Sequence, residues 1–196
     1  EKQAERLLQD RAERDSLTRL LNKHAGRRYG EDYLSQYPQG IHCALLIIDL
    51  DNFKQVNDRY GHLFGDTVLT NVARVLKKMF RSQDIIARMG GDEFMVLMRG
   101  ISDEELLKNR CRQLINVFGN TFRRLSQDVP LSCSVGIAIA PVHGRSYYEL
   151  FQHADQAMYQ AKAKGKNTFA FYDGSSVSTY GQHRHMSVID SDQEPG

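Results

Sequence analysis

The fold of this chain is decided by one stretch, CALLIIDLD, at Cys43–Asp51. Its first six residues, Cys43–Ile48, are all apolar and predict a strand that is buried on both faces. Acidic residues follow at once, so we expect this strand to end in carboxylates. The run is far shorter than the roughly 20 apolar residues that a membrane-spanning helix needs.

The patterns around this strand predict a β-α-β-β-α-β core, the ferredoxin-like order, in an α+β domain whose mixed, mainly antiparallel sheet is flanked by helices. Two apolar runs joined by Gly90-Gly91 indicate a hairpin. A capping box, in which a Ser and a Glu three residues later satisfy each other's backbone amides, predicts the start of each of two later helices. The predicted elements after the first strand are a helix over Val68–Met79, strands at Ile85–Arg88 and Phe94–Met98, a helix over Leu107–Leu125 capped by Ser102 and Glu105, a strand at Leu131–Ala140, a helix over Leu150–Lys164 capped by Ser146 and Glu149, and a strand at Thr168–Tyr172.

Length and charge limit the function classes. The 196 residues are 41% hydrophobic, enough for one domain with a core, and 26 basic against 24 acidic residues give a net charge of +2. A dedicated binder of nucleic-acid polymers would carry a strong basic excess, so that class is excluded and any anionic partner must bind at a local site.

The two ends of the chain differ from its middle. We expect residues 1–14 to form a connector helix, residues 15–173 the folded domain, and residues 174–196 a flexible tail or linker, because the tail is polar and lacks periodicity. The polar N-terminus does not resemble a signal peptide. We expect buried thiols at Cys43, Cys111 and Cys133, no membrane contact by this fragment, and a cytoplasmic location, either free or as the cytoplasmic part of a larger receptor.

Two acidic clusters are expected to meet. Asp49 and Asp51 end the first strand, and Asp92-Glu93 lie at the hairpin, so neighbouring strands would bring them together. Clustered carboxylates repel one another unless a cation neutralises them, and all-oxygen ligands suit Mg²⁺ or Mn²⁺. We expect Asp49 and Asp51 to point to opposite faces, which leaves Asp49, next to the Leu50 carbonyl, as the metal ligand. For either cluster alone, solvated loop acids remain the alternative.

The motif Gly90-Gly91-Asp92-Glu93-Phe94 carries a resemblance. From about Asp15 to Tyr172 the chain resembles the GGDEF family of diguanylate cyclases. Further motifs match in order, namely Asp49–Lys54, Asn57-Asp58, Tyr60-Gly61-His62, Gly65-Asp66 and Asp155–Asn167. The resemblance implies a palm-type sheet like that of nucleotide cyclases, and a homodimer that condenses two GTP into cyclic di-GMP and releases two pyrophosphates.

The resemblance also implies roles at the acidic clusters. Asp49, the Leu50 carbonyl and Asp92 would hold the divalent metals, two Mg²⁺ or Mn²⁺ per active site. Asp92 would also accept the proton of the attacking 3′-hydroxyl, with Glu93 as an accompanying acid. Lys54, beside the acidic strand end, would neutralise phosphate.

Nucleotide contacts follow from the same resemblance. Asn57 and Asp66 would read the guanine edge, with His62 beside the same nucleotide. Lys162 and Lys166 match the family's triphosphate-binding pair, although the family often has Arg where this chain has Lys166, and Lys lacks the two-pronged geometry of Arg. The alternatives are a packing histidine and a solvated basic helix end.

A second site is indicated by Arg81-Ser82-Gln83-Asp84, which matches the family's inhibitory Arg-x-x-Asp motif five residues before Gly90. Arg and Asp can together bind phosphate and guanine donors, so this site would bind the cyclic di-GMP product, with Arg112 as a further contact. The alternative is an ordinary loop ion pair.

The match departs from the family at Asp15–Lys23, where Arg19 and Lys23 replace the usual Gly and Arg, and we interpret this segment as structural. Two other functions stay open. One is a catalytically silent module that binds GTP or cyclic di-GMP. The other is an adenylyl-type cyclase, which conflicts with the guanine-reading pair Asn57 and Asp66.

Overall fold

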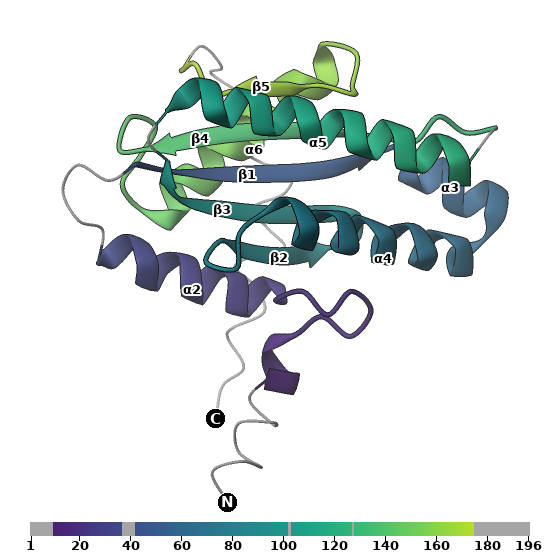
Figure 1. Ribbon diagram of the computed structural model, residues 1–196, viewed down its shortest axis with the longest axis horizontal. Coiled ribbons are helices and arrows are strands. Elements are labelled where there is room, and N and C mark those ends of the chain that lie inside the picture. The colour runs from purple at the N-terminus through teal and green to yellow at the C-terminus, as the bar shows by residue number, and fades with distance from the viewer. Residues whose placement is uncertain (1–9, 37–41, 102, 127, 175–196) are drawn as a thin grey trace, which may run out of the picture.

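A five-stranded sheet forms the centre of the computed structural model, which describes residues 10–36, 42–101, 103–126 and 128–174 (Figure 1). The strand order is β2-β3-β1-β4-β5, and only the β4–β5 pair is parallel. The strands are β1 (His42–Asp51), β2 (Ile85–Gly90), β3 (Glu93–Ile101), β4 (Ser132–Ala140) and β5 (Phe169–Phe171). The apolar run and its acidic end, Cys43–Asp51, therefore lie in the middle strand.

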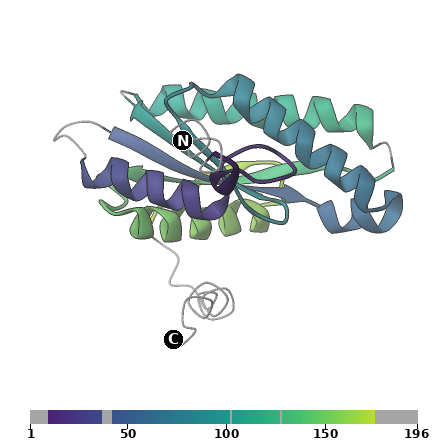
Figure 2. The same cartoon turned by 90° about the horizontal axis from the view of Figure 1, so that it is seen from below.

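Helices cover both faces of the sheet (Figures 1 and 2). One face carries α3 (Phe53–Tyr60), α4 (His62–Met79) and α5 (Glu104–Leu125), and the other carries α2 (Lys23–Ser35) and α6 (Tyr147–Ala163). Alternate β1 side chains serve the two layers: Leu46 and Ile48 pack on the α4–α5 side, and Leu45 and Ile47 on the α2–α6 side. Burial on both faces explains the unbroken apolar run, as predicted.

The predicted core order is confirmed as β1, α4, β2, β3, α5 and β4, followed by α6 and β5. Two helices were not predicted. Helix α3 has only eight residues, and its N-cap, Asn52, adopts a left-handed conformation (φ 62°) without a side-chain capping bond. Helix α2 begins at a conventional cap, Asn22, but buries few large apolar side chains. Helix α3 buries only Phe53 and Val56, too short a pattern to stand out in the sequence.

One capping prediction is confirmed and one is wrong. Ser146 and Glu149 form the expected capping box of α6. The N-cap of α5 is Asp103, whose carboxylate accepts the Glu105 amide at 2.9 Å, and not Ser102, which lies outside the described residues. A carboxylate two residues before the amide satisfies that donor equally well, so the helix begins one residue later.

Helix α6 lies unusually close to the sheet. A Cβ atom on Gly136 of β4 would come within 1.9 Å of the Ala154 carbonyl oxygen, so only glycine fits there. This approach sets the height of α6, and with it of Lys162 near its end, above β1.

The three cysteines are buried, as predicted, and burial raises the pKa of Cys43 and Cys111 to about 12. The predicted connector and tail fall mostly on residues 1–9 and 175–196, outside the described residues. Within the described ranges, every helix is too short or too polar to cross a membrane.

Candidate functional site

The acidic end of β1 and the turn between β2 and β3 meet at one edge of the sheet. Asp49 pairs with Glu93 across the β1–β3 ladder, and the Leu50 amide donates to the Asp92 carbonyl at 3.2 Å. The predicted convergence of the two acidic clusters is therefore confirmed. It brings Asp49, the Leu50 backbone, Asp92 and Glu93 together.

The expectation that Asp49 and Asp51 point to opposite faces is wrong. Residues two apart in a strand lie on the same face, and both carboxylates continue the face that α6 covers. Asp49 Oδ1 accepts Lys162 Nζ at 2.6 Å, while Asp51 Oδ1 accepts the Ser134 hydroxyl at 2.7 Å. Their partners differ in kind: Asp49 pairs with the charged Lys162, whereas Asp51 accepts two hydroxyls and a backbone amide.

The donor set at this edge fits a hard cation. Asp49 is 3% exposed, and its Lys162 partner shows that a positive charge is accommodated against this buried carboxylate. Among the described residues, no three His, Cys, Asp or Glu side chains converge on one point. The predicted ligands, Asp49, the Leu50 carbonyl and Asp92, would offer a cation only oxygen atoms, and Mg²⁺ usually completes such a shell with water and phosphate.

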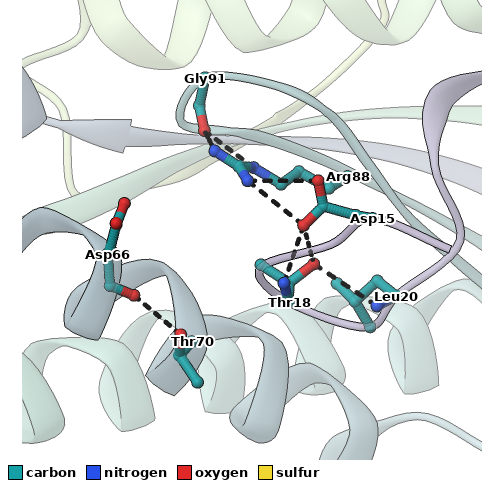
Figure 3. Close-up of polar contacts among 7 residues, drawn as sticks. All are labelled: Asp15, Thr18, Leu20, Asp66, Thr70, Arg88 and Gly91. Carbon is teal, nitrogen blue, oxygen red and sulfur yellow. Dashed lines mark hydrogen bonds and ion pairs between the residues drawn. The ribbon is translucent and has the colours of Figure 1, made fainter.

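An arginine that the sequence analysis did not single out holds the turn (Figure 3). Arg88 of β2 donates from Nε and Nη2 to the Gly91 carbonyl at 3.1 and 2.8 Å, and from Nη1 to Asp15 at 3.2 Å. Asp15 also accepts the amide and hydroxyl of Thr18 at 2.8 and 2.7 Å. Arg88 therefore ties the segment before α2 to the residue before Asp92. An arginine two residues ahead of the glycine pair is the only signal for it in the sequence.

The environment of Asp15 lowers the pKa of its carboxyl group. Burial alone would raise that pKa, but the hydrogen bonds from Thr18 and the charge of Arg88 outweigh burial and hold the pKa below its usual value. Asp15 is thus kept ionised beside the guanidinium. The segment interpreted as structural is attached directly to the turn.

The predicted guanine-reading residues lie on α3 and α4. Asn57 Oδ1 is buried and has no hydrogen-bond partner among the described residues. It occupies the space that a Cβ on Gly65 would need, since such an atom would lie 1.9 Å from it. Asp66 is exposed, its side chain points away from α4 in Figure 3, and His62 is exposed at the first residue of α4. The structure therefore brings Asn57 against the Gly65-Asp66 turn of α4.

Two of the three predicted phosphate lysines contact the end of β1. Lys162 reaches Asp49, and Lys166 Nζ donates to Asn52 Oδ1 at 2.8 Å. Lys54 is exposed in the first turn of α3, directly after the strand. The alternative of a wholly solvated basic helix end does not describe Lys162, which is partly buried in an ion pair.

The predicted second site is a tight turn before β2. Asp84 accepts the amides of Arg81 at 2.9 Å and Arg99 at 3.1 Å, and Arg81 and Asp84 line a small pocket. Arg112 does not line that pocket. Its guanidinium binds its own helix neighbours, Glu105 and Asn109, at 3.0 and 2.7 Å.

Comparison with known proteins identifies the family of this chain. Residues 12–168 match the family described as diguanylate cyclase, GGDEF domain. Similar proteins include the bifunctional diguanylate cyclase/cyclic di-GMP phosphodiesterase MucR of Pseudomonas aeruginosa, 39% identical over 82% of this chain and 24% of that protein. Cyclic di-GMP phosphodiesterase PdeR of Escherichia coli is 37% identical over 88% of this chain and 26% of that protein. Diguanylate cyclase DosC of Escherichia coli is 34% identical over 82% and 35%. The chain thus spans about a quarter to a third of the length of these proteins.

Solved structures match over nearly their whole length. The GGDEF domain of YfiN from Pseudomonas aeruginosa is 34% identical, with a TM-score of 0.74 over 82% of this chain and 94% of that one. The GGDEF domain of DgcB from Caulobacter crescentus, in complex with c-di-GMP, is 26% identical, with a TM-score of 0.74 over 82% and 96%. Such domains have the palm-type nucleotide cyclase fold, so the predicted fold class is confirmed.

Proposed function

Since the chain belongs to the GGDEF family of diguanylate cyclase domains, we propose that it condenses two GTP molecules into cyclic di-GMP and releases two pyrophosphates. The observation that carries this proposal is the hydrogen bond from the Leu50 amide to the Asp92 carbonyl, because it sets the acidic strand end against the GGDEF turn. The acids of both motifs, Asp49, Asp92 and Glu93, are present and adjacent.

In this proposal Asp49, the Leu50 carbonyl and Asp92 hold Mg²⁺ or Mn²⁺, two ions per active site. Bound there, the cations supply positive charge at the α-phosphate and the leaving oxygen. Asp92 accepts the proton of the attacking 3′-hydroxyl, and Glu93 lies beside it as an accompanying acid. Arg88 keeps the turn in place by its two bonds to the Gly91 carbonyl.

The remaining residues bind and orient the nucleotide. Lys162, Lys166 and Lys54 neutralise the phosphates, and Lys162 and Lys166 are already directed to the strand end by Asp49 and Asn52. Asn57 and Asp66 bind the guanine edge, with His62 nearby. The unpartnered Asn57 Oδ1 supports this role, because a buried oxygen without a donor can accept one from a ligand.

A product with two identical halves requires two such sites facing each other, so the active form is a homodimer. Product feedback is assigned to Arg81 and Asp84, which line a pocket before β2, with Arg112 as a further contact only if its side chain leaves Glu105. The DgcB GGDEF domain, solved with c-di-GMP, supports product binding by this fold. An Arg81→Ala variant is expected to lose product inhibition, and an unchanged inhibition curve would remove the assignment.

A second candidate is a domain that binds GTP or cyclic di-GMP without turnover. It is favoured by one observation, the similarity over 88% of this chain to PdeR, whose name is that of a phosphodiesterase. The presence of all the motif acids favours catalysis.

The test is turnover of GTP by Asp92→Ala. The matched control is Asp128→Ala, which removes an exposed aspartate that pairs with Arg59 at 3.4 Å far along the chain from the motif. Asp92→Ala is expected to stay folded and to form no cyclic di-GMP, while Asp128→Ala turns over like the parent chain. Normal turnover by Asp92→Ala would sink the proposal.

A further inference from the structure

The segment after α6 forms a bend of unusual backbone geometry. Three consecutive residues, Gly165, Lys166 and Asn167, have φ values of 110°, 64° and 49°. Glycine adopts such angles freely and asparagine tolerates them, but the side chain of lysine disfavours them, and two non-glycine residues in a row are uncommon. The amides of Gly165 and Lys166 donate back to the carbonyls of Lys162 and Ala161 at 3.2 and 3.3 Å, so the amide of Asn167 is the one held from outside the helix.

Asp51 supplies such a bond. Its side chain is 1% exposed, and Oδ2 accepts the backbone amide of Asn167 at 3.0 Å. The hydroxyls of Ser132 and Ser134 on β4 donate to Oδ2 and Oδ1 at 2.6 and 2.7 Å. The two serines therefore fix the orientation of the carboxylate, and the carboxylate holds the last residue of the bend.

The bend carries Lys166, one of the lysines assigned to phosphate binding, and it follows Lys162, another of them. Lys166 is the residue before Asn167, and its Nζ reaches Asn52 Oδ1 at 2.8 Å. Lys162 precedes the bend by one helical turn, and its Nζ reaches Asp49 Oδ1 at 2.6 Å. If the Asn167 amide were released, the bend after Lys166 would lose its bond to β1, and Lys166, held then only by the hydrogen bond from its amide to the Ala161 carbonyl, would be less firmly directed to the end of β1. Lys162, held by the intact helix, would be less affected.

We propose that Asp51 is a positioning residue for the triphosphate: its buried carboxylate holds the Asn167 amide and thereby sets Lys166, and to a lesser degree Lys162, toward the phosphates of a bound guanine nucleotide. This inference rests on the proposed function. It assigns to the second acid of the strand a role different from that of Asp49, because Asp51 acts through the bend and does not touch substrate or metal.

A positioning role predicts a selective loss. In Asp51→Ala, affinity for the triphosphate falls about tenfold, the size expected for one charge-assisted hydrogen bond, while affinity for the nucleoside stays within twofold. The probes are 3′-deoxy-GTP, which binds without turnover because it lacks the attacking hydroxyl, and 3′-deoxyguanosine. Asp51→Asn keeps an oxygen that can accept the Asn167 amide and is expected to rescue triphosphate affinity.

A second pair of variants tests the bend if Asp51→Ala fails to fold. Asn167 is exposed, so changing it spares the core. Asn167→Pro removes the amide and cannot adopt a positive φ, whereas Asn167→Gly keeps both the amide and the conformation. Asn167→Pro is expected to lose triphosphate affinity selectively, and Asn167→Gly to keep it.

The outcomes separate the two claims. If the parent chain fails to bind 3′-deoxy-GTP, the proposed function fails, and the inference with it. If the parent chain binds it and either Asp51→Ala or Asn167→Pro binds it equally well, only the inference is overturned. An equal loss of affinity for 3′-deoxy-GTP and 3′-deoxyguanosine also overturns it, because that pattern indicates general damage to the site.

Discussion

Gly65 leaves the space in which the side chain of Asn57 lies, and we propose that this side chain reads guanine. A Cβ at position 65 would stand 1.9 Å from Asn57 Oδ1, 3.0 Å from its Cγ and 3.2 Å from Phe53 Cζ. Carbon and oxygen atoms without a covalent bond do not approach within 3.0 Å, so Gly65→Ala must move Oδ1 by about 1 Å or more. The helix is otherwise compatible with alanine.

The expected cost falls on binding and not on folding. Displacing Oδ1 loses one neutral hydrogen bond to guanine, about 0.5–1.5 kcal/mol, which raises the Kd or KM for GTP about 2- to 12-fold. Alanine is a better helix former than glycine by about 1 kcal/mol, and the clash is with the far end of a side chain. We therefore expect stability within about 1 kcal/mol of the parent chain.

The assay compares GTP binding and urea unfolding for Gly65→Ala and Gly119→Ala. Gly119 lies in α5, and a Cβ there would meet nothing within 4 Å, so this control gains helix propensity alone. It is expected to be about 0.5–1 kcal/mol more stable with unchanged GTP affinity. Parent-like GTP affinity in a folded Gly65→Ala would refute the placement of Asn57 in the guanine site.

Three further changes have expected outcomes. Arg88→Met releases the Gly91 carbonyl and leaves the partly buried Asp15 without its cation. We therefore expect a free energy of unfolding in urea that is about 1–3 kcal/mol lower, and turnover that is at least tenfold slower. The control is Arg14→Met, which breaks only an exposed ion pair. Because the pKa of Asp15 lies below its usual value, the stability that Asp15 contributes is present above about pH 4 and is lost as the pH falls below that. Arg88→Met should flatten this pH dependence, and a profile parallel to that of the parent chain would contradict the prediction. Gly136→Ala places a Cβ 1.9 Å from the Ala154 carbonyl oxygen, so α6 must move away from β4. The free energy of unfolding should fall by about 1–3 kcal/mol or more, measured as a lower Tm. An unchanged Tm would rule out the close approach. Burial and the neighbouring His153 lower the pKa of His143, whose Nδ1 accepts the Ile139 amide at 3.0 Å. The stability of the parent chain should therefore decrease as the pH is lowered through about 6.5, and it should decrease less in His143→Gln. Equal slopes in urea unfolding between about pH 8 and 5 would refute this.

Local patterns in the sequence were enough to predict β1 and the hairpin. Burial on both faces requires the unbroken apolar run of β1, and the two glycines permit the turn before Asp92, so both features are encoded by neighbouring residues. The order of the strands then brings the acids together. The shared face of Asp49 and Asp51 also follows from strand alternation, and the expectation of opposite faces misapplied that rule.

Other features could not be predicted because their partners are distant in the sequence. Arg88 and Asp15 are 73 residues apart, and Asp51 and Asn167 are 116 apart. Helix α3 begins at a left-handed asparagine, a conformation that residue type alone does not determine. Family resemblance, and not local pattern, predicted the roles of four residues, Asn57, Asp66, Lys162 and Lys166. The contacts of Lys162 with Asp49 and of Lys166 with Asn52, and the burial of Asn57 Oδ1, appear only in the folded chain.

The most direct test of the account is the mass of the product formed when the protein is incubated with GTP and Mg²⁺, with ATP as the parallel substrate. We expect cyclic di-GMP and pyrophosphate from GTP, and no cyclic dinucleotide from ATP, because a site built around the guanine donors leaves its own groups unpaired with adenine. A folded protein that binds GTP but forms no cyclic di-GMP would contradict the account and leave a nucleotide-binding module in its place.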